Sequence, residues 1–309
     1  MTLYILKRIF LFIPTLLGIT LITFFLMQSL PGDPVLGMAG ERANSETLER
    51  IRAELGQDRP LVLQYVGYLK LLVTGELGRS YYTNRKITDD LLQKFPNTIK
   101  LAIAAMLFAS ILGILMGAFA AVHQGTAWDR LVTLISVGGI SIPVFWLGLA
   151  LMLIFSFYLT WLPPSGMGNG DLRYLILPAA TLGTFSLAYI ARITRSSMLE
   201  TLSQPYIAAA RAKGLSETKI IFRHALKNSL IPIITLIGLD LGSYLNGAVL
   251  TETIFGWDGL GRYALEGIMK RDYPVIMGVV LFGAGIFVTM NLLVDISYHF
   301  FDPRVRVKK

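Results

Sequence analysis

The sequence lacks the residues and motifs on which most catalytic sites depend. It contains no cysteine, which excludes disulfides, thiol catalysis and cysteine metal ligands. Its three histidines, His123, His224 and His299, do not pair with one another or with a carboxylate at metal-ligand spacing. Neither a G-x-x-x-x-G-K-[ST] phosphate loop nor a G-x-S-x-G nucleophile elbow occurs. We therefore expect a non-catalytic chain that holds no metal or cofactor of its own.

Charged residues are also scarce. They make up 16% of the chain, against roughly a quarter in soluble domains, whereas 54% of the residues are hydrophobic. The formal net charge of +8 could suggest nucleic acid, but in a membrane chain it more often reflects cytoplasmic loops that face anionic lipid. We expect lipid contact and no nucleic-acid partner.

Six charge-poor runs predict six transmembrane helices and an all-α integral membrane fold. The runs cover residues 9 to 30, 101 to 122, 131 to 159, 174 to 191, 228 to 249 and 275 to 294. The first run is longer than the core of a signal peptide, which has about 7 to 15 residues, and no small-x-small cleavage site follows it. We expect residues 1 to 30 to form an uncleaved N-terminal transmembrane helix.

The basic residues predict which loops face the cytoplasm. With Lys7 and Arg8 inside, the loop over residues 192 to 228 is cytoplasmic and is rich in lysine and arginine. The basic tail over residues 299 to 309 falls on the same side, and the more acidic loop over residues 250 to 274 falls outside. This asymmetry follows the positive-inside rule, so both termini are predicted to be cytoplasmic.

Residues 31 to 94 are predicted to lie outside and to form a small helical segment that precedes a permease core over residues 95 to 298. Ser45 can cap a helix that ends at Gly56, and a second helix begins after Asp58 with Pro60 in its first turn. Apolar stripes on both helices favour a cap packed on the membrane domain. A docking surface for an outside partner is compatible with the same pattern.

Two features lie within the predicted spans. Small residues recur every four positions at Ala109, Gly113, Gly117 and Ala121, which predicts close packing against another helix. Asp240 follows Asn228 by twelve residues, which places it about 18 Å into a core of about 30 Å. We hypothesise that Asp240 faces a polar translocation path. A hydrogen-bonded acid that holds helices together, or a shorter fifth helix, would also explain it.

The loop YIAAARAKGLSETKIIFRHALKNSLIP, over residues 206 to 232, is predicted to form two short helices. Pro205 can start an alanine-rich helix that ends at Gly214, because glycine enters the left-handed conformation without a Cβ penalty. Ser216 can cap a second helix that runs to about Asn228, with Pro232 just inside the next span. Composition allows either an interfacial helix pair held by anionic lipid or a rigid lever that fits a groove on a cytoplasmic protein.

The arrangement A-A-x-x-x-G, with Ala209, Ala210 and Gly214, resembles the coupling loop (the EAA loop) of ABC importer permeases. The run Y-I-x-x-A-R-A-K-G-L-S resembles the form in dipeptide and oligopeptide permeases. The general pattern asks for Glu at Ala208, Ile at His224 and Pro at Lys227, and this chain departs from it there. The resemblance implies a site for ATPase coupling. Its residues are Tyr206, Ala209, Ala210, Arg211, Ala212, Lys213, Gly214 and Leu215.

Similar motifs follow in order along almost the whole chain. They are PGDP, LGQDRPLVLQYVGYL, GELGRS, ARITRSSMLE, LTETIFGWDGLGR, RDYPV, NLLVD and DPRVR. The series resembles the B-type permease of a dipeptide, oligopeptide, glutathione or nickel-chelate importer with the type I fold, in a bacterial or archaeal plasma membrane. The resemblance implies a homologous C-type permease, two cytoplasmic ATPases that bind ATP, and an external solute-binding protein as partners. A secondary transporter or channel, and a membrane enzyme or scaffold, are the competing interpretations.

Overall fold

The computed structural model describes residues 2–29, 48–49, 52–53, 56 and 58–301, and most of this part of the chain is helical. The α-helices are α1 (Thr2–Ser29), α4 (Leu61–Val73), α5 (Ile87–Val122), α6 (Ala127–Ser141), α7 (Val144–Met152), α8 (Arg173–Leu202), α9 (Pro205–Ala212), α10 (Glu217–Lys219), α11 (Lys227–Leu245), α12 (Val249–Ile254), α13 (Leu260–Lys270) and α14 (Tyr273–Phe301). Two π-helical segments, Leu153–Tyr158 and Ile220–Leu226, continue α7 and α10, and Gly168–Gly170 forms a 3-10 turn.

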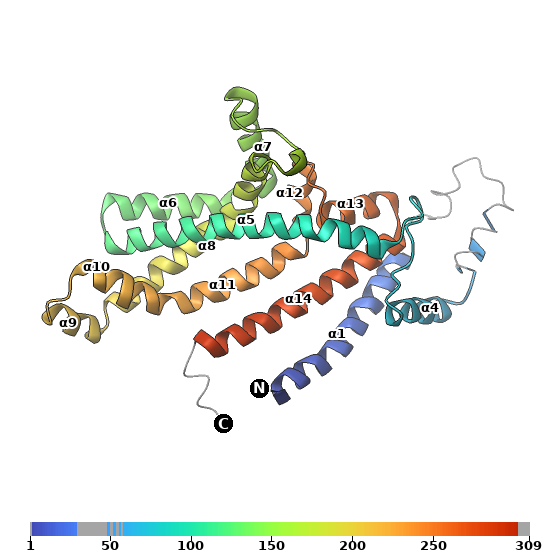
Figure 1. Ribbon diagram of the computed structural model, residues 1–309, viewed down its shortest axis with the longest axis horizontal. Helices are drawn as coiled ribbons and strands as arrows, with labels where there is room; N and C mark the ends of the chain where they lie inside the picture. The colour runs from blue at the N-terminus through green and yellow to red at the C-terminus, as the bar shows by residue number, and fades with distance from the viewer. Residues whose placement is uncertain (1, 30–47, 50–51, 54–55, 57, 302–309) are drawn as a thin grey trace.

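The long helices lie side by side and the short helices gather at the two ends of the bundle (Figure 1). The loop that carries α9 and α10 lies at one end, and α4, α12 and α13 lie at the other. The N-terminal end of α1 and the C-terminal end of α14 point toward the α9 end. The described ends of the chain therefore lie toward the same end of the bundle as α9 and α10, and the cytoplasmic orientation of that end stays a prediction.

Most of the predicted spans coincide with single apolar helices. Within the described part of the chain, four are long and apolar enough to cross a membrane: α5, α8, the combined helix Glu217–Leu245, and α14 over Tyr273–Leu293. In α1, the apolar stretch Ile13–Leu26 is shorter. The third predicted span is not one straight helix, because α6 and α7 meet at an angle of 105°. Counting this bent pair as one span gives five long spans among the described residues, with the shorter apolar stretch of α1 beside them, so the predicted count of six is not confirmed.

The break between α6 and α7 follows from Pro143. A proline disfavours helical backbone in the residue before it and donates no hydrogen bond of its own. Ile142 is accordingly extended, with ψ of 126°, and Pro143 is extended too, with ψ of 132°. The α7 segment therefore projects from the bundle instead of continuing along α6 (Figure 1).

The predicted ridge of small residues is confirmed as a packing surface. Ala109, Gly113, Gly117 and Ala121 are all buried on α5. A Cβ added at Gly113 would lie 2.8 Å from the backbone oxygen of Leu187 on α8, and one at Gly117 would overlap the oxygen of Ala191. The two longest helices thus approach each other so closely that a larger side chain has no room.

Of the helix predicted from Ser45, the structure describes only residues 48–49 and 52–53, which are helical, whereas the one predicted after Asp58 is present as α4. The Pro60 carbonyl accepts hydrogen bonds from the backbone N–H groups of Leu63 and Gln64, so Pro60 directly precedes the helix. The Tyr65 and Thr20 hydroxyls lie 3.0 Å apart and join α4 to α1. Helix α5 begins at Ile87, so the boundary suggested at residue 94 lies within it.

Candidate functional site

The first helix of the candidate site is α9, and it ends as the sequence predicts. Pro205 occupies its first turn, and Gly214 adopts the left-handed conformation with φ of +76°. The Leu215 N–H donates to the Ala210 carbonyl at 3.3 Å, across this glycine. Such a bond closes a helix end and requires a residue that tolerates positive φ, so Gly214 fixes the direction of the bend.

The second helix differs from the prediction in two respects. It does not stop near Asn228, because α10, the π-helical segment and α11 form one helix over Glu217–Leu245. Pro232 therefore lies inside α11. Ser216 occupies the N-cap position, but its side chain makes no cap hydrogen bond. The loop is thus joined to a membrane helix with no break between them.

Helix α9 is held against this long helix by a small apolar contact and one hydrogen bond. Ile207 and Ala210 on α9 are buried against Ile220. The Asn228 side chain donates from Nδ2 to the Tyr206 hydroxyl at 2.8 Å. These contacts hold α9 against the long helix at its first turn and near its middle.

An ion pair spans the bend at Gly214. The Arg211 guanidinium donates to both Glu217 oxygens, at 2.8 and 3.3 Å. The hydrogen bond to Glu217 raises the pKa of the Arg211 guanidinium above its ordinary value. Both side chains are exposed, and exposed pairs of this kind add little stability because water and salt screen them.

The predicted coupling residues divide between an exposed surface and the support beneath it. Tyr206, Ala209, Arg211, Ala212, Lys213 and Gly214 are exposed, whereas Leu215 is half-buried and Ala210 is buried. Ala208 joins the exposed set, so the outer face of α9 carries three alanines with Ala209 and Ala212. We call these three alanines the alanine face. Its short side chains let another protein approach the backbone of α9 closely.

The base of the loop is packed into the helix bundle. Ala225, in the π-helical segment, is buried with Ala121 of α5 and Met198 of α8. The Ser229 and Thr201 hydroxyls lie 3.3 Å apart at the same level. A displacement of α9 would therefore act on three long helices together.

Asp240 lies further along α11, where it belongs to a polar chain that reaches α8. Its Oδ2 lies 2.5 Å from the Ser186 hydroxyl, which lies 2.7 Å from the Tyr244 hydroxyl. The Tyr244 hydroxyl in turn donates to the Leu182 carbonyl at 2.9 Å. Asp240 is half-buried, so it both joins two helices and keeps part of its surface exposed. Ser186 and Tyr244 were not predicted, although Tyr244 shares a helix face with Asp240 at a spacing of four.

A second polar cluster lies at the α12–α13 end. It was not predicted, because its acidic residues were interpreted as charges of an exposed outside loop. Glu252 is fully buried and accepts hydrogen bonds from the Thr98 hydroxyl at 3.0 Å and the Arg262 N–H at 2.9 Å. Burial raises the pKa of the Glu252 carboxyl. A Cβ at Gly259 would lie 2.6 Å from this carboxylate, so the glycine lets the backbone close over it.

At the same end, Asp272 joins two motifs that lie far apart in the sequence. It is buried and accepts hydrogen bonds from the Ser80 hydroxyl at 2.6 Å and the Tyr81 N–H at 3.2 Å. Ser80 belongs to GELGRS and Asp272 to RDYPV. Burying a carboxylate is costly unless hydrogen-bond donors satisfy it. Glu252 and Asp272 both accept the hydrogen bonds given above, so their burial is compensated.

Comparison with known families then identifies the chain. Residues 113–307 match the family described as "Binding-protein-dependent transport system inner membrane component". Residues 1–102 match "Binding-prot-dependent transport system membrane comp, N-term". The chain belongs to this family of transport permeases. It is accordingly a multi-pass protein of the inner membrane, as its apolar helices indicate.

Several relatives are similar to the permease over nearly its whole length. It is 43% identical to the "Di/tripeptide transport system permease protein DppB" of Pseudomonas aeruginosa, over 98% of both chains. It is 41% identical to the "Dipeptide transport system permease protein DppB" of Escherichia coli K12, over 99% of both chains. The protein of that name from Alkalihalophilus pseudofirmus is 41% identical, over 98% of this chain and 99% of that one.

The fold of the permease is similar to that of a protein of known structure. The structure described as "Inward facing conformations of the MetNI methionine ABC transporter" aligns with a TM-score of 0.59 and 17% sequence identity. The alignment covers 68% of this chain and 95% of that chain. The permease thus has the fold of an ABC importer membrane subunit, as predicted.

Proposed function

We propose that this permease forms half of the translocation path of an ATP-driven importer for dipeptides and oligopeptides. Near full-length similarity to permeases named for dipeptide and di/tripeptide transport supports the peptide class. The single structural observation that supports coupling is the continuous helix Glu217–Leu245, which joins the exposed alanine face to the membrane interior. The chain itself is non-catalytic in this proposal.

The proposed assembly contains the partners that the sequence suggested. A homologous C-type permease supplies the other half of the path, and two cytoplasmic ATPases bind and hydrolyse ATP. An external solute-binding protein delivers the peptide. The α9 end then faces the cytoplasm together with both termini, and the α12–α13 end faces outward.

Movement of the ATPases reaches the path through α9. The alanine face would lie in a groove on the ATPase subunit that binds this permease. When the two ATPase subunits close on each other, that groove would carry α9 with it. Because α9 is fixed to Ile220 and Asn228, the displacement passes into the long helix without being absorbed at the bend. The membrane helices then rock between inward and outward access.

Asp240 is proposed to line the path, on the side of α11 that meets α8. The proposal is supported by the partial exposure of Asp240 and by its hydrogen bond with Ser186, which form a polar contact between α11 and α8. Transport assays on Asp240→Asn, compared with Ser186→Ala, test this role. Reduced uptake or an altered pH dependence in Asp240→Asn is expected, and unchanged uptake at every pH would refute it.

The experiment that tests the function is uptake of a radiolabelled dipeptide by cells that carry the whole transporter, together with affinity purification through a tag on this chain. We expect two ATPase subunits to co-purify and uptake to require ATP. A secondary transporter or channel would transport without them. Competition by nickel chelates or glutathione, but not by peptides, would instead favour those cargoes.

Ala209→Trp sharpens the test of coupling, with Ala127→Trp as a matched control on an exposed alanine of α6. A bulky ring on the alanine face should prevent ATPase docking, so the ATPases should no longer co-purify with the permease. The same ring on α6 should leave co-purification unchanged. Equal losses in both variants would count against α9 as the docking element.

A further inference from the structure

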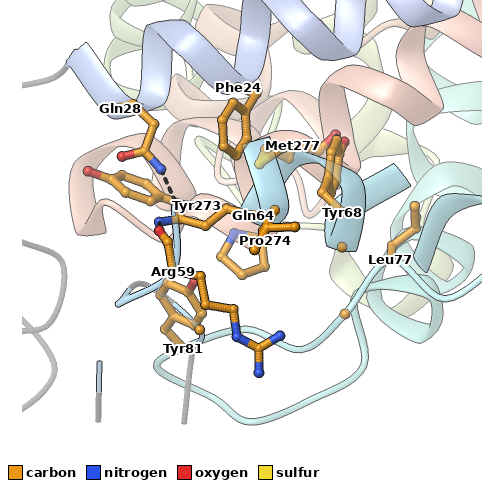
Figure 2. Close-up of a pocket in the computed structure, with 14 residues that line it drawn as sticks. Phe24, Gln28, Arg59, Gln64, Tyr68, Leu77, Tyr81, Tyr273, Pro274 and Met277 are labelled. Carbon is orange, nitrogen blue, oxygen red and sulfur yellow. Dashed lines mark hydrogen bonds between the residues drawn. The ribbon is translucent and has the colours of Figure 1, made fainter. Parts of the chain in front are cut away.

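A cavity of about 350 Å³ lies among α1, α4 and the start of α14, away from the loop and from Asp240 (Figure 2). Helix α1 contributes Phe24 and Gln28, α4 contributes Leu63, Gln64, Gly67 and Tyr68, and α14 contributes Tyr273, Pro274 and Met277. Arg59, Leu77 and Tyr81 complete most of the remaining wall. None of these residues belongs to the proposed coupling site or translocation path.

The cavity is apolar along its walls and polar at defined points. Figure 2 shows Phe24, Tyr68 and Met277 together on one side. The Gln28 amide donates to the Gln64 side chain at 3.0 Å, and Gln64 donates to the Arg59 carbonyl at 2.7 Å. Figure 2 shows the Arg59 guanidinium at the edge of the cavity farther from α1. A ligand that fits must therefore be apolar over most of its contact and carry an anion at one end.

The surroundings of the cavity indicate where such a ligand comes from. Helix α4 exposes Leu61, Val62, Leu63 and Val66, and the neighbouring turns of α1 expose Leu21, Ile22, Phe25 and Leu26. Exposed apolar side chains of this kind, on a helix at the end of the spans, are stable against the interfacial region of a bilayer. Lipid is therefore the apolar solvent immediately beside the cavity.

We propose that the cavity binds one phospholipid of the leaflet at the α4 end. The Arg59 guanidinium pairs with the phosphate, since arginine bonds phosphate oxygens through two parallel N–H groups. The glycerol region and the first methylenes of an acyl chain lie against Phe24, Tyr68 and Met277. The rest of the acyl chains lie outside the cavity, along the exposed residues of α1 and α4. The bound lipid would join α4 to α1 and α14.

Gly67 allows a direct test, because it lines the cavity and a Cβ added there would meet no atom within 4 Å among the described residues. Gly67→Leu should fill the cavity without displacing the backbone. Gly18 on α1 is a matched control, since a Cβ there also meets no described atom and Gly18 does not line the cavity. The assembled transporter is reconstituted in nanodiscs of phosphatidylethanolamine and phosphatidylglycerol, and retained lipid is measured by native mass spectrometry.

We expect the wild type and Gly18→Leu to retain one phospholipid more per permease than Gly67→Leu. Arg59→Gln should lower its occupancy by about tenfold, the effect of losing one charge-assisted contact. Equal retention in Gly67→Leu and the wild type would overturn the proposal. A retained mass that matches a peptide or free phosphate would overturn it as well.

Discussion

The two ends of the helix bundle are stabilised in different ways. At the α12–α13 end, the carboxylates of Glu252 and Asp272 are buried; Glu252 accepts hydrogen bonds from α5 and α13, and Asp272 accepts them from the segment that precedes α5. At the α9 end, the carboxylate of Glu217 is exposed and pairs with the exposed Arg211. The carboxylates of Glu252 and Asp272 are therefore satisfied inside the protein, whereas the ion pair beside the alanine face lies at the surface; a buried carboxylate at the α9 end, that of Asp129, pairs with Arg195 beneath that surface.

This contrast separates fixed structure from surface available to a partner. Unpaired buried polar groups are costly, so the contacts of Glu252 and Asp272 hold one arrangement of the loops around them. The apolar support of α9 consists of the small cluster of Ile207, Ala210 and Ile220. The alanine face above that cluster is exposed, as a docking element requires.

The largest effect on stability is expected at Glu252. Glu252→Ala leaves the Thr98 hydroxyl and the Arg262 N–H without their acceptor and opens a cavity, so the free energy of unfolding should fall by about 3 kcal/mol. Thermal unfolding of the purified protein in detergent measures this loss. Glu252→Gln, which keeps the shape and one acceptor oxygen, should lose less. A melting temperature unchanged in Glu252→Ala would show that this cluster does not stabilise the α12–α13 end.

The largest effect on coupling is expected at Gly214. A β-branched residue in the left-handed conformation costs at least about 1 to 2 kcal/mol, so Gly214→Val should redirect the bend between α9 and α10. Substrate-stimulated ATP hydrolysis by the assembled transporter should fall, while membrane insertion stays intact. Gly214→Asn is the matched control, since asparagine tolerates positive φ. Normal coupled hydrolysis in Gly214→Val would contradict the role of a rigid bend.

An intermediate effect is expected at Asp272. Asp272→Asn keeps the side-chain shape but weakens the charge-assisted hydrogen bonds from Ser80 and Tyr81, which should cost about 1 kcal/mol. The loss should appear as a lower melting temperature in the same detergent assay. Asp258→Asn provides a comparison with a more exposed carboxylate at the same end. If the two variants lost equal stability, burial would not determine how much each carboxylate contributes to the stability of this end.

The smallest effect on stability is expected at the ion pair of the α9 end. Arg211→Gln removes an exposed partner that water and salt already screen, so the melting temperature should hardly change. Raising the ionic strength, which screens this ion pair, should likewise leave the melting temperature of the wild type unchanged. A melting-temperature loss as large as that of Asp272→Asn would remove the contrast between the two ends.

Local sequence patterns predicted much of the fold. Long apolar runs located the helices, Gly214 located the bend, and the spacing of Gly113 and Gly117 identified the packed face of α5. The break at Pro143 was also readable from the residues, but the length of the apolar run over residues 131 to 159 obscured it. Pro232 lies inside α11, as predicted, but the continuation of α10 into α11 was not predicted, because the second helix of the loop was expected to end near Asn228.

The candidate site was predicted in part for a related reason. The alanine-rich pattern predicted the helix that carries the proposed coupling residues, yet it did not distinguish Ala209, which is exposed, from Ala210, which is buried against Ile220. Which side of a short helix faces inward depends on what packs against it. That contact comes from a segment ten residues further along and is visible only after the chain has folded.

The sequence by itself determined the membrane character of this permease, its helix positions and the left-handed bend at Gly214. These depend on local properties: apolar area over about 20 residues, and the steric freedom of one glycine. Only the tertiary structure decided that Glu252 is buried beside Thr98 and that Asp240 meets Ser186. In each case a charge along the chain says nothing about its partner, because residues 54 to 154 positions apart supply the donor.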